Sequence, residues 1–280
     1  MNWDAAFSSP LHDIPLVFVD VETTGLRPER GDRVCEVGLA VYRGETEVLR
    51  FSSLVNPQRP ISPGAAAVNG LTDAELADAP TFAAIAPQVT TALALGVPVA
   101  HNAPFDLAFL GHELGLAGAP IPEMPAIDTL ALSRRLLPYR RHSLAELAWH
   151  FGILPSGRTH RALSDALTTR QLLRKLCQTA RLPAQTPLAE LFVLQGGPSH
   201  WPIPAAEQTV PLPPDMAQVI RAGRPLHLTY LAGDGRCSRR TVQPLHVLDS
   251  DGALYLVAFC TLRQAERTFR LDRIIAWEPA

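Results

Sequence analysis

Acidic side chains in three separate parts of the chain, with one histidine, are placed to do metal-dependent chemistry. Asp20 and Glu22 stand two residues apart after the apolar run 16–19. A strand turns every second side chain to the same face, so both carboxylates point the same way. Two adjacent carboxylates at the end of a buried strand are costly unless a partner, usually a divalent cation, compensates their charge. An acidic loop after an ordinary strand is the alternative, and this pair alone leaves it open.

Two further acids stand where strands end or helices begin. Asp106 follows the short apolar run 97–100, and Asp165 opens a long amphipathic segment. Such places are where α/β sheets form their sites. Four carboxylates gathered there would require cations, and oxygen ligands without clustered Cys or His favour Mg²⁺ or Mn²⁺ over zinc. Two such ions, about 3.5 to 4 Å apart, clamp a phosphodiester in known two-metal sites.

His160 is the candidate proton acceptor. It lies five residues before Asp165, which on a helix would place it about 140° away. We therefore expect His160 in the loop before the helix, leaning over the site. A neutral imidazole there is suited to take a proton from water near neutral pH.

The elements that must position these residues follow from hydrophobic periodicity. We predict strands at 16–19, 34–42, 47–55 and 97–100, and helices near 72–75, 81–95, 104–114, 128–137 and 143–151. The segment 159–180 begins with a polar turn and continues as a long amphipathic helix. The first three strands have short polar connections and predict an antiparallel meander. The strand-and-helix units that follow indicate an α/β class, with helices covering the sheet.

The remainder of the chain predicts a linker and a second domain. Proline interrupts 183–214 repeatedly, which is typical of a stiff linker. Within it, the apolar segment 188–194 is expected to pack on its own domain, with docking on a partner as the alternative. A short helix at 216–222 and strands at 226–231, 237–242, 254–259 and 268–271 then indicate a small barrel or sandwich. The expected domains are 1–182 and 215–280.

Composition limits the class of protein. The 280 residues are 47% hydrophobic and 19% charged, with a net charge of -2, which suits a globular protein with a real core. We find no apolar run long enough to cross a bilayer and no secretory signal, so we expect no membrane partner and a cytoplasmic location. The four cysteines form no metal-binding pair and are expected to be reduced.

Three short segments resemble a known family. They are Asp20-Val21-Glu22-Thr23-Thr24-Gly25, His101-Asn102-Ala103-Pro104-Phe105-Asp106 and His160-Arg161-Ala162-Leu163-Ser164-Asp165. Together they resemble the three motifs of the DEDD exonucleases, in the histidine-containing (DEDDh) branch that includes DnaQ-like proofreading subunits of bacterial replicative DNA polymerases. The resemblance covers roughly 15–181. It implies a ribonuclease-H-like mixed sheet flanked by helices, and a two-metal 3′ to 5′ exonuclease.

Carried over position by position, the resemblance assigns roles to individual residues. It implies that Asp20, Glu22, Asp106 and Asp165 hold two Mg²⁺ or Mn²⁺ ions and that His160 is the general base. The expected substrate-binding residues are Thr24, Gly25, Asn102 and Phe105. Taken singly, an Asp near a helix start is more often a cap, but caps have no reason to recur in this order. Asp128 resembles a structural acid of the fold. We expect His101 to pack at the sheet end and His142 to lie in a solvent-facing turn.

The C-terminal part, roughly 224–277, resembles a WYL domain. The matching segments are Leu254-Tyr255-Leu256, 239–244 and 267–274. The resemblance implies a small SH3-like or Sm-like β-barrel that binds nucleic acid or a nucleotide-like ligand. The candidate contact residues are Tyr230, Arg240, Tyr255, Arg270 and Arg273, since arginines and tyrosines suit phosphates and stacked bases. A solvated charged surface is the alternative.

These expectations combine into one hypothesis and two alternatives. The hypothesis is a 3′ to 5′ exonuclease acting preferably on single-stranded DNA, with a C-terminal regulatory module and a polymerase or repair protein as a partner. The first alternative is an RNA-trimming exonuclease or oligoribonuclease, because readout of the 2′-hydroxyl is not visible in sequence. The second is a WYL-type regulator that senses nucleic acid or a nucleotide.

Overall fold

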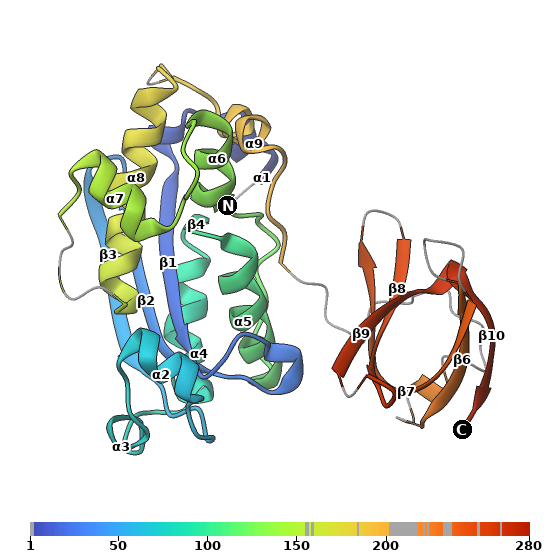
Figure 1. Ribbon diagram of the computed structural model, residues 1–280. Coiled ribbons are helices and arrows are strands. Elements are labelled where there is room, and N and C mark those ends of the chain that lie inside the picture. Colours follow the sequence, from blue (N-terminus) through green and yellow to red (C-terminus); the bar gives the residue numbers. More distant parts are fainter. Residues whose placement is uncertain are drawn as a thin grey trace. The chain divides into compact units, whose positions relative to one another are not determined.

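The chain divides into two compact units, Met1–Pro204 and Ala205–Ala280, each with a sheet of its own (Figure 1). This computed structural model describes residues 3–154, 157, 160–183, 185–201, 218–220, 222, 224–231, 237–250, 253–263 and 265–280. No helix in the described ranges combines the length and the apolar character needed to cross a membrane.

A five-stranded mixed sheet forms the centre of the first unit, in the order β3-β2-β1-β4-β5. The strands are β1 (Pro15–Thr23), β2 (Val34–Arg43), β3 (Thr46–Leu54), β4 (Val97–Ala100) and β5 (Ile127–Asp128). β1, β2 and β3 pair antiparallel, as the predicted meander requires. β4 then joins β1 in parallel, and β5 joins β4 in parallel. The two-residue β5 is too short to produce a periodic pattern and was not predicted.

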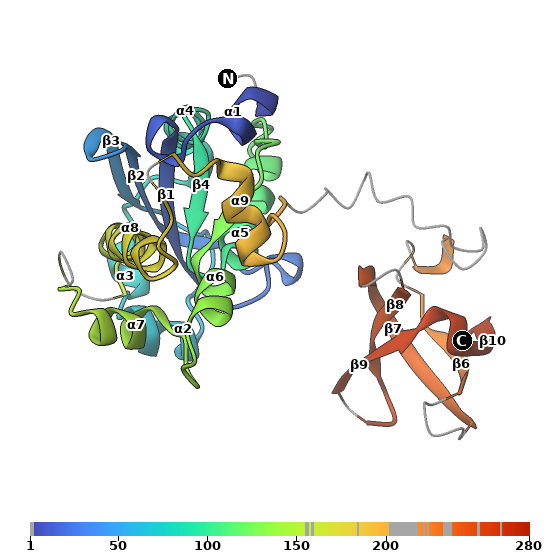
Figure 2. The same cartoon turned by 90° about the horizontal axis from the view of Figure 1, so that it is seen from above.

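Helices cover this sheet. They are α1 (Trp3–Ser8), α2 (Pro63–Asn69), α3 (Asp73–Leu76), α4 (Phe82–Leu93), α5 (Ala103–Leu116), α6 (Thr129–Leu136), α7 (Leu144–Phe151), α8 (Ala162–Thr179) and α9 (Leu188–Gln195). The longest, α8, lies along β1 and β2 (Figure 2). Helix starts follow the caps in the sequence: Ser143 accepts a hydrogen bond from the backbone of Glu146 in α7, and Thr72 closes a capping box at α3.

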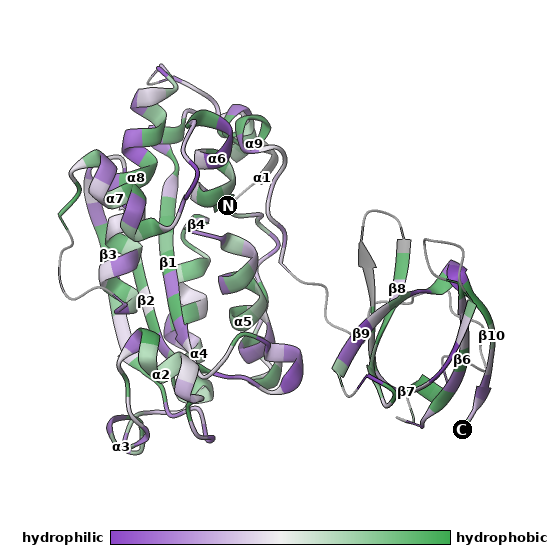
Figure 3. Cartoon of the chain, viewed as in Figure 1, coloured by the Kyte–Doolittle hydropathy of each residue, from purple (hydrophilic) through white to green (hydrophobic). Residues whose placement is uncertain are grey.

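Alternation along β1 separates the two faces of the sheet. Val17, Val19 and Val21 pack into one hydrophobic cluster with α4 and α5. Phe18 points to the other face, into a cluster that includes residues of α6, α7, α8 and α9. Asp20 and Glu22 continue the Phe18 face, since side chains two apart share a side. Figure 3 shows β1 as mostly hydrophobic, with hydrophilic positions toward its C-terminal end.

Helix α9 lies inside the segment 183–214 that was expected to be a linker. Its Leu188, Leu191 and Phe192 are buried in the cluster on the α8 face of the sheet. The prediction that this apolar segment packs on its own domain is therefore confirmed. The N-terminal helix α1 packs against α9 and was not predicted.

The second unit holds a five-stranded antiparallel sheet in the order β10-β6-β7-β8-β9. The strands are β6 (Leu226–Leu231), β7 (Cys237–Ser250), β8 (Ala253–Cys260), β9 (Ala265–Arg270) and β10 (Ile274–Pro279). Strand β7 continues eight residues beyond its predicted end at 242, because it pairs with the whole length of β8. Strand β10 was not predicted. Of the predicted helix at 216–222, residues 218–220 are helical, whereas 216, 217 and 221 lie outside the described residues.

Candidate active site

The C-terminal half of β1 carries two carboxylates toward α8. Asp20 pairs in register with Gly38 of β2, and Glu22 pairs with Glu36. Both Asp20 and Glu22 are half-buried. The alternation predicted from sequence therefore holds in the structure, and the two side chains project from the same face of the sheet.

Asp106 reaches the same region from the first turn of α5. It is buried, with a relative exposure of 3%. Its Oδ1 accepts a hydrogen bond of 3.1 Å from the backbone N–H of Val21, the residue between Asp20 and Glu22. This bond fixes α5 against the end of β1. Asp106 is thus held next to the two strand carboxylates.

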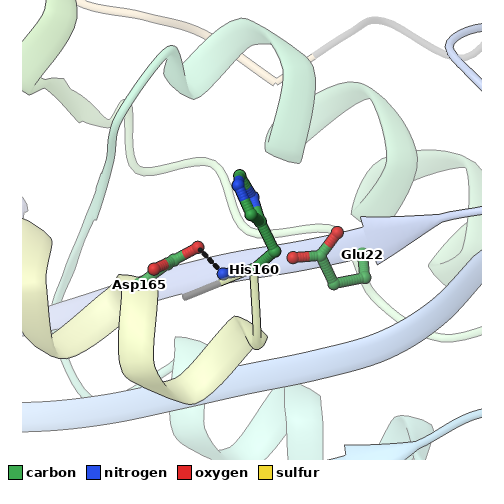
Figure 4. Close-up of side chains that lie close together, drawn as sticks. All are labelled: Glu22, His160 and Asp165. Carbon is green, nitrogen blue, oxygen red and sulfur yellow. Dashed lines mark hydrogen bonds between the residues drawn. The ribbon is translucent and has the colours of Figure 1, made fainter. Parts of the chain in front are cut away.

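His160 and Asp165 complete the group from the start of α8. His160 adopts a left-handed backbone conformation, with φ of +57°, which is uncommon outside glycine. Its backbone N–H donates a hydrogen bond of 3.1 Å to Asp165 Oδ2. Figure 4 shows the imidazole standing between Glu22 and Asp165. The three residues each offer a ligand atom, and these atoms lie within 4.8 Å of one another.

All five residues line one cleft of about 730 Å³. Its other lining residues come chiefly from α7 and the residues directly before and after it: Val21, His101, Phe105, Ser143, Leu144, Ala145, Ala148, Trp149, Ile153, Leu154 and Thr168. One side of the cleft is therefore acidic and the other largely apolar. Such a division suits a ligand that has both a charged group and a flat ring.

Burial and mutual repulsion disfavour the charged forms of the carboxylates. Burial, followed by the charges of Asp106 and Glu22, raises the pKa of Asp20 well above its ordinary value. Burial, followed by the charges of Asp165 and Glu36, raises the pKa of Glu22 to about 7. Burial also raises the pKa values of Asp106 and Asp165. The site thus holds more potential negative charge than the protein compensates, and its oxygen-rich donor set fits hard divalent cations.

An ion pair between Arg161 and a buried carboxylate, which sequence reasoning missed, positions the start of α8. The guanidinium of Arg161 donates to both carboxylate oxygens of Glu36 on β2, at 2.9 to 3.1 Å. Arg161 directly follows His160. The place of Arg161 inside the motif 160–165 was a signal that this residue matters. Its partner Glu36, however, is 125 residues away on β2, and no local pattern indicates it.

Gly38 of β2 allows α8 to lie close to the sheet. A Cβ at this position would overlap backbone atoms of Ala162 and Leu163 in the first turn of α8. Only glycine permits this approach, which brings Asp165 toward Asp20, the register partner of Gly38. In the sequence, a glycine inside a predicted strand was the signal that another segment approaches the backbone closely at this position.

Comparison with known proteins identifies the family. The model of the family described as "Exonuclease" matches residues 17–173, a range that includes all five residues. The chain belongs to the exonuclease family. The WYL domain model matches residues 214–279, so the exonuclease domain is followed by a WYL domain.

Curated relatives agree with this assignment, and a solved structure has the same fold. The chain is 36% identical over 178 residues to a DNA polymerase III subunit epsilon-like protein of Rhodobacter capsulatus, covering 61% of this chain and 25% of that protein. It is 33% identical over 175 residues to the DNA polymerase III subunit epsilon of Treponema pallidum, covering 61% of this chain and 80% of that protein. The nuclease domain of 3′hExo, described as a DEDDh family member bound to rAMP, shares the fold at 17% identity and a TM-score of 0.50, covering 61% of this chain and 94% of that chain. The chain spans a quarter or less of several other relatives, 18% in the case of the 3′-5′ exonuclease DinG of Bacillus subtilis.

The four expected substrate-binding residues occupy different places in the exonuclease domain. Phe105 lines the cleft, whereas Thr24, Gly25 and Asn102 do not contribute to its described lining. Thr24 is fully buried, and its hydroxyl oxygen accepts a hydrogen bond from the backbone N–H of Arg33. A Cβ on Gly25 would overlap the carboxylate of Asp32. Thr24 and Gly25 thus shape the loop that leaves β1.

Asn102 takes part in a turn between β4 and α5. It has φ of +76°, and its backbone N–H donates a hydrogen bond of 3.0 Å to Asp128 Oδ1. The same oxygen caps α6 by accepting from the backbone N–H of Leu130. Asp128 therefore has the structural role that its sequence position indicated.

Two other histidines considered in the sequence analysis, His101 and His142, form hydrogen bonds within the protein. The ring nitrogens of His101 lie 2.9 Å from Thr129 Oγ1 and 2.8 Å from the carbonyl oxygen of His142, which confirms the predicted packing at the sheet end. The prediction for His142 was wrong. Its ring is half-buried between Ser133 Oγ and the carbonyl oxygen of Tyr139, because the turn folds back on α6.

The candidate residues of the WYL domain fall into more than one environment. Tyr255 and Arg270 are cross-strand partners, and the backbone N–H of Arg270 donates to Tyr230 Oη at 3.3 Å. The Tyr230 ring packs edge-on against Phe269. Arg240 instead lines a cavity of about 330 Å³ with His227, Arg239, Thr241 and Glu278. Arg273 is half-buried in the short helical turn before β10.

Proposed function

We propose that this protein is a 3′ to 5′ exonuclease that hydrolyses phosphodiester bonds at the 3′ end of DNA, preferably single-stranded DNA. The observation that carries the proposal is the gathering of Asp20, Glu22, Asp106, His160 and Asp165 around one open cleft. Membership of the exonuclease family supports it. The cleft's apolar side, with Phe105, gives a terminal base a surface to pack against.

The four carboxylates are the proposed ligands of two Mg²⁺ or Mn²⁺ ions. Their oxygen donors and raised pKa values fit such cations, because bound positive charge would favour the ionised carboxylates. When bound, the ions supply Lewis-acid stabilisation of charge on the phosphodiester. Asp106 also has a positioning role. Its hydrogen bond to the backbone of Val21 keeps the end of β1, with its two carboxylates, next to α5.

His160 is the proposed general base. Its imidazole lies over the cleft beside Glu22 and Asp165 and is exposed enough to exchange protons with solvent. The backbone N–H of His160 donates a hydrogen bond to Asp165. This bond positions the residue without involving the nitrogens of its ring. A neutral imidazole in this place would accept the proton of the attacking water.

The C-terminal module is proposed to be an SH3-like or Sm-like barrel, residues 215–280, that binds nucleic acid or a nucleotide-like ligand and regulates the exonuclease domain, residues 1–182. The cavity that Arg239 and Arg240 line together with His227, Thr241 and Glu278 supports this role, because guanidinium groups bind phosphate. A polymerase or repair protein as a partner is proposed from the epsilon-subunit relatives.

Digestion of end-labelled oligonucleotides tests the proposed activity. Single- and double-stranded DNA and RNA of matched sequence would be incubated with Mg²⁺, with Mn²⁺ or with a chelator. We expect stepwise shortening from the 3′ end, fastest on single-stranded DNA, with no cleavage in chelator or with Asp165→Asn. Faster digestion of RNA would favour the RNA-trimming alternative. No cleavage by the whole chain, with tight binding of DNA or a nucleotide, would favour the regulator.

A further inference from the structure

A second cavity adjoins the active-site cleft, and the proposed chemistry does not use it. It has a volume of about 620 Å³. The two cavities share two lining residues, Ala145 and Trp149 of α7. These residues are four apart in the helix and therefore lie on the same face. The two cavities thus meet along one row of side chains on α7, and Trp149 borders both.

Aromatic side chains form much of the second cavity. Trp149 has a relative exposure of 77%, which is unusual for so large a side chain. The ring of His150 lies edge-on to Trp149, with centroids 5.0 Å apart. Tyr139 stacks on His150, with centroids 4.3 Å apart and an angle of 14° between the rings. Exposed flat rings of this kind stack with nucleic-acid bases irrespective of sequence.

The charge of the second cavity is also favourable for a phosphate backbone. Arg140 and Arg141 line it, and Glu146 is the one carboxylate among its described lining residues. Arg141 Nη1 lies 3.4 Å from Glu146 Oε1. This ion pair is weak, because the side chain of Arg141 is 83% exposed to solvent. Arg140 is exposed and forms no ion pair with any residue that the structure describes. At least one guanidinium is thus available for phosphate.

We infer that this second cavity binds the single-stranded segment directly 5′ of the nucleotides held in the cleft. The inference rests on the proposed exonuclease function and adds to it a specificity for strand length and for unpaired bases. A strand that leaves the cleft over Trp149 would enter a cavity that offers both ring faces and positive charge. Bases in a duplex are already stacked and paired, so only an unpaired segment can use these rings.

The test compares a substrate confined to the cleft with substrates that extend beyond it. The p-nitrophenyl ester of thymidine 5′-monophosphate serves as the short substrate, and oligothymidylates of increasing length serve as the long ones. Arg140→Glu reverses the charge of the second cavity at a residue that does not line the cleft. Arg43→Glu is the matched control, because Arg43 pairs with Pro15 at the opposite end of β1 from Glu22. Circular dichroism verifies that both variants fold.

We expect kcat/KM of the wild-type protein to rise with oligonucleotide length until the second cavity is filled. Arg140→Glu should then lower kcat/KM for the longer oligonucleotides by tenfold or more, with the rate on the ester unchanged. Arg43→Glu should leave both substrates at wild-type values. The loss in Arg140→Glu should be much smaller on a blunt duplex of the same length.

Three results would overturn the inference. Hydrolysis of the ester without any length dependence, or a length dependence that Arg140→Glu leaves intact, removes the second cavity from substrate binding while the proposed function stands. An equal loss on duplex and single strand removes the preference for unpaired bases. Failure of the wild-type protein to hydrolyse either kind of substrate removes the proposed function itself, and with it this subsite.

Discussion

Arg161 and Glu36 form a two-pronged ion pair that fastens the first turn of α8 to β2. Arg161 Nε lies 2.9 Å from one carboxylate oxygen of Glu36, and Arg161 Nη2 lies 3.0 Å from the other. Glu36 is buried, with 2% exposure, and pairs in register with Glu22. Because Arg161 stands next to His160, this pair fixes both sides of the candidate active site at once.

Breaking this ion pair should lower both stability and activity. In Arg161→Ala the buried Glu36 loses its partner, and such a loss costs on the order of 3 kcal/mol, less here because Arg161 is partly exposed. We expect urea unfolding to show the loss in stability and oligonucleotide digestion to show a fall in kcat of tenfold or more.

A double variant separates positioning from folding. Combining Arg161→Met with Glu36→Gln removes the uncompensated charge and should recover much of the stability. We expect kcat to stay low, since the ion pair then no longer orients the first turn of α8. Recovery of kcat together with stability would show that the ion pair acts on folding alone.

A methyl group at Gly38 should displace α8 from the sheet. The overlap is with backbone atoms of Ala162 and Leu163, which cannot rotate away as a side chain can. We expect Gly38→Ala to lower the exonuclease rate at least tenfold and to destabilise the protein by about 1 to 3 kcal/mol. Gly115→Ala in α5 is the control, because a Cβ there meets no atom within 4 Å. Equal behaviour of the two variants in thermal unfolding and digestion would contradict the assigned role of Gly38.

Local sequence patterns predicted the parts of the site that depend on a strand or a helix start. Alternation placed Asp20 and Glu22 on one face of β1, and the motif before α8 placed His160 outside the helix, where the structure has it. Both features depend on neighbours within a few residues. Periodicity and capping are signals of that range.

Contacts between distant segments could not be predicted in this way. The partner of Arg161 is on β2, and the atoms that exclude a side chain at Gly38 belong to α8. His142 was expected in solvent because its turn is polar, yet the turn folds onto Ser133. In each case the contact depends on how segments distant in the chain pack together. The pattern of a single sequence does not show which distant segments meet.

Substitution of His160 should change how the exonuclease rate depends on pH. Only the neutral ring of an imidazole accepts a proton, so a histidine base makes the rate rise with pH. With saturating Mg²⁺, the wild-type rate should therefore rise with pH, and in His160→Gln it should be lower by roughly 10² to 10⁴ and lack that rise. Mg²⁺ binding, followed by calorimetry, should change little. A wild-type pH profile in His160→Gln would exclude His160 as the base.

Removal of divalent metal should make the protein less stable as the pH rises. The pKa of Glu22 is raised from an ordinary value of 4.5 to about 7, and those of Asp20, Asp106 and Asp165 are raised as well. The metal-free folded state therefore binds more protons than the unfolded chain. Its stability falls between about pH 4.5 and 7 as these protons are lost, and Glu22 alone contributes up to roughly 3 kcal/mol to that fall.

Thermal unfolding at several pH values in chelator and in Mg²⁺ measures this effect. We expect the melting temperature in chelator to drop from pH 5 to pH 8, and Mg²⁺ to restore it at pH 8, because a cation bound to ionised carboxylates stabilises only the folded state. Glu22→Gln tests whether ionisation of Glu22 causes part of this drop. Because the amide cannot ionise, the melting temperature of this variant should fall less between pH 5 and pH 8. A melting temperature that rises with pH in chelator, or a drop of wild-type size in Glu22→Gln, would mean that burial and mutual repulsion do not raise the pKa values of these carboxylates in the folded state.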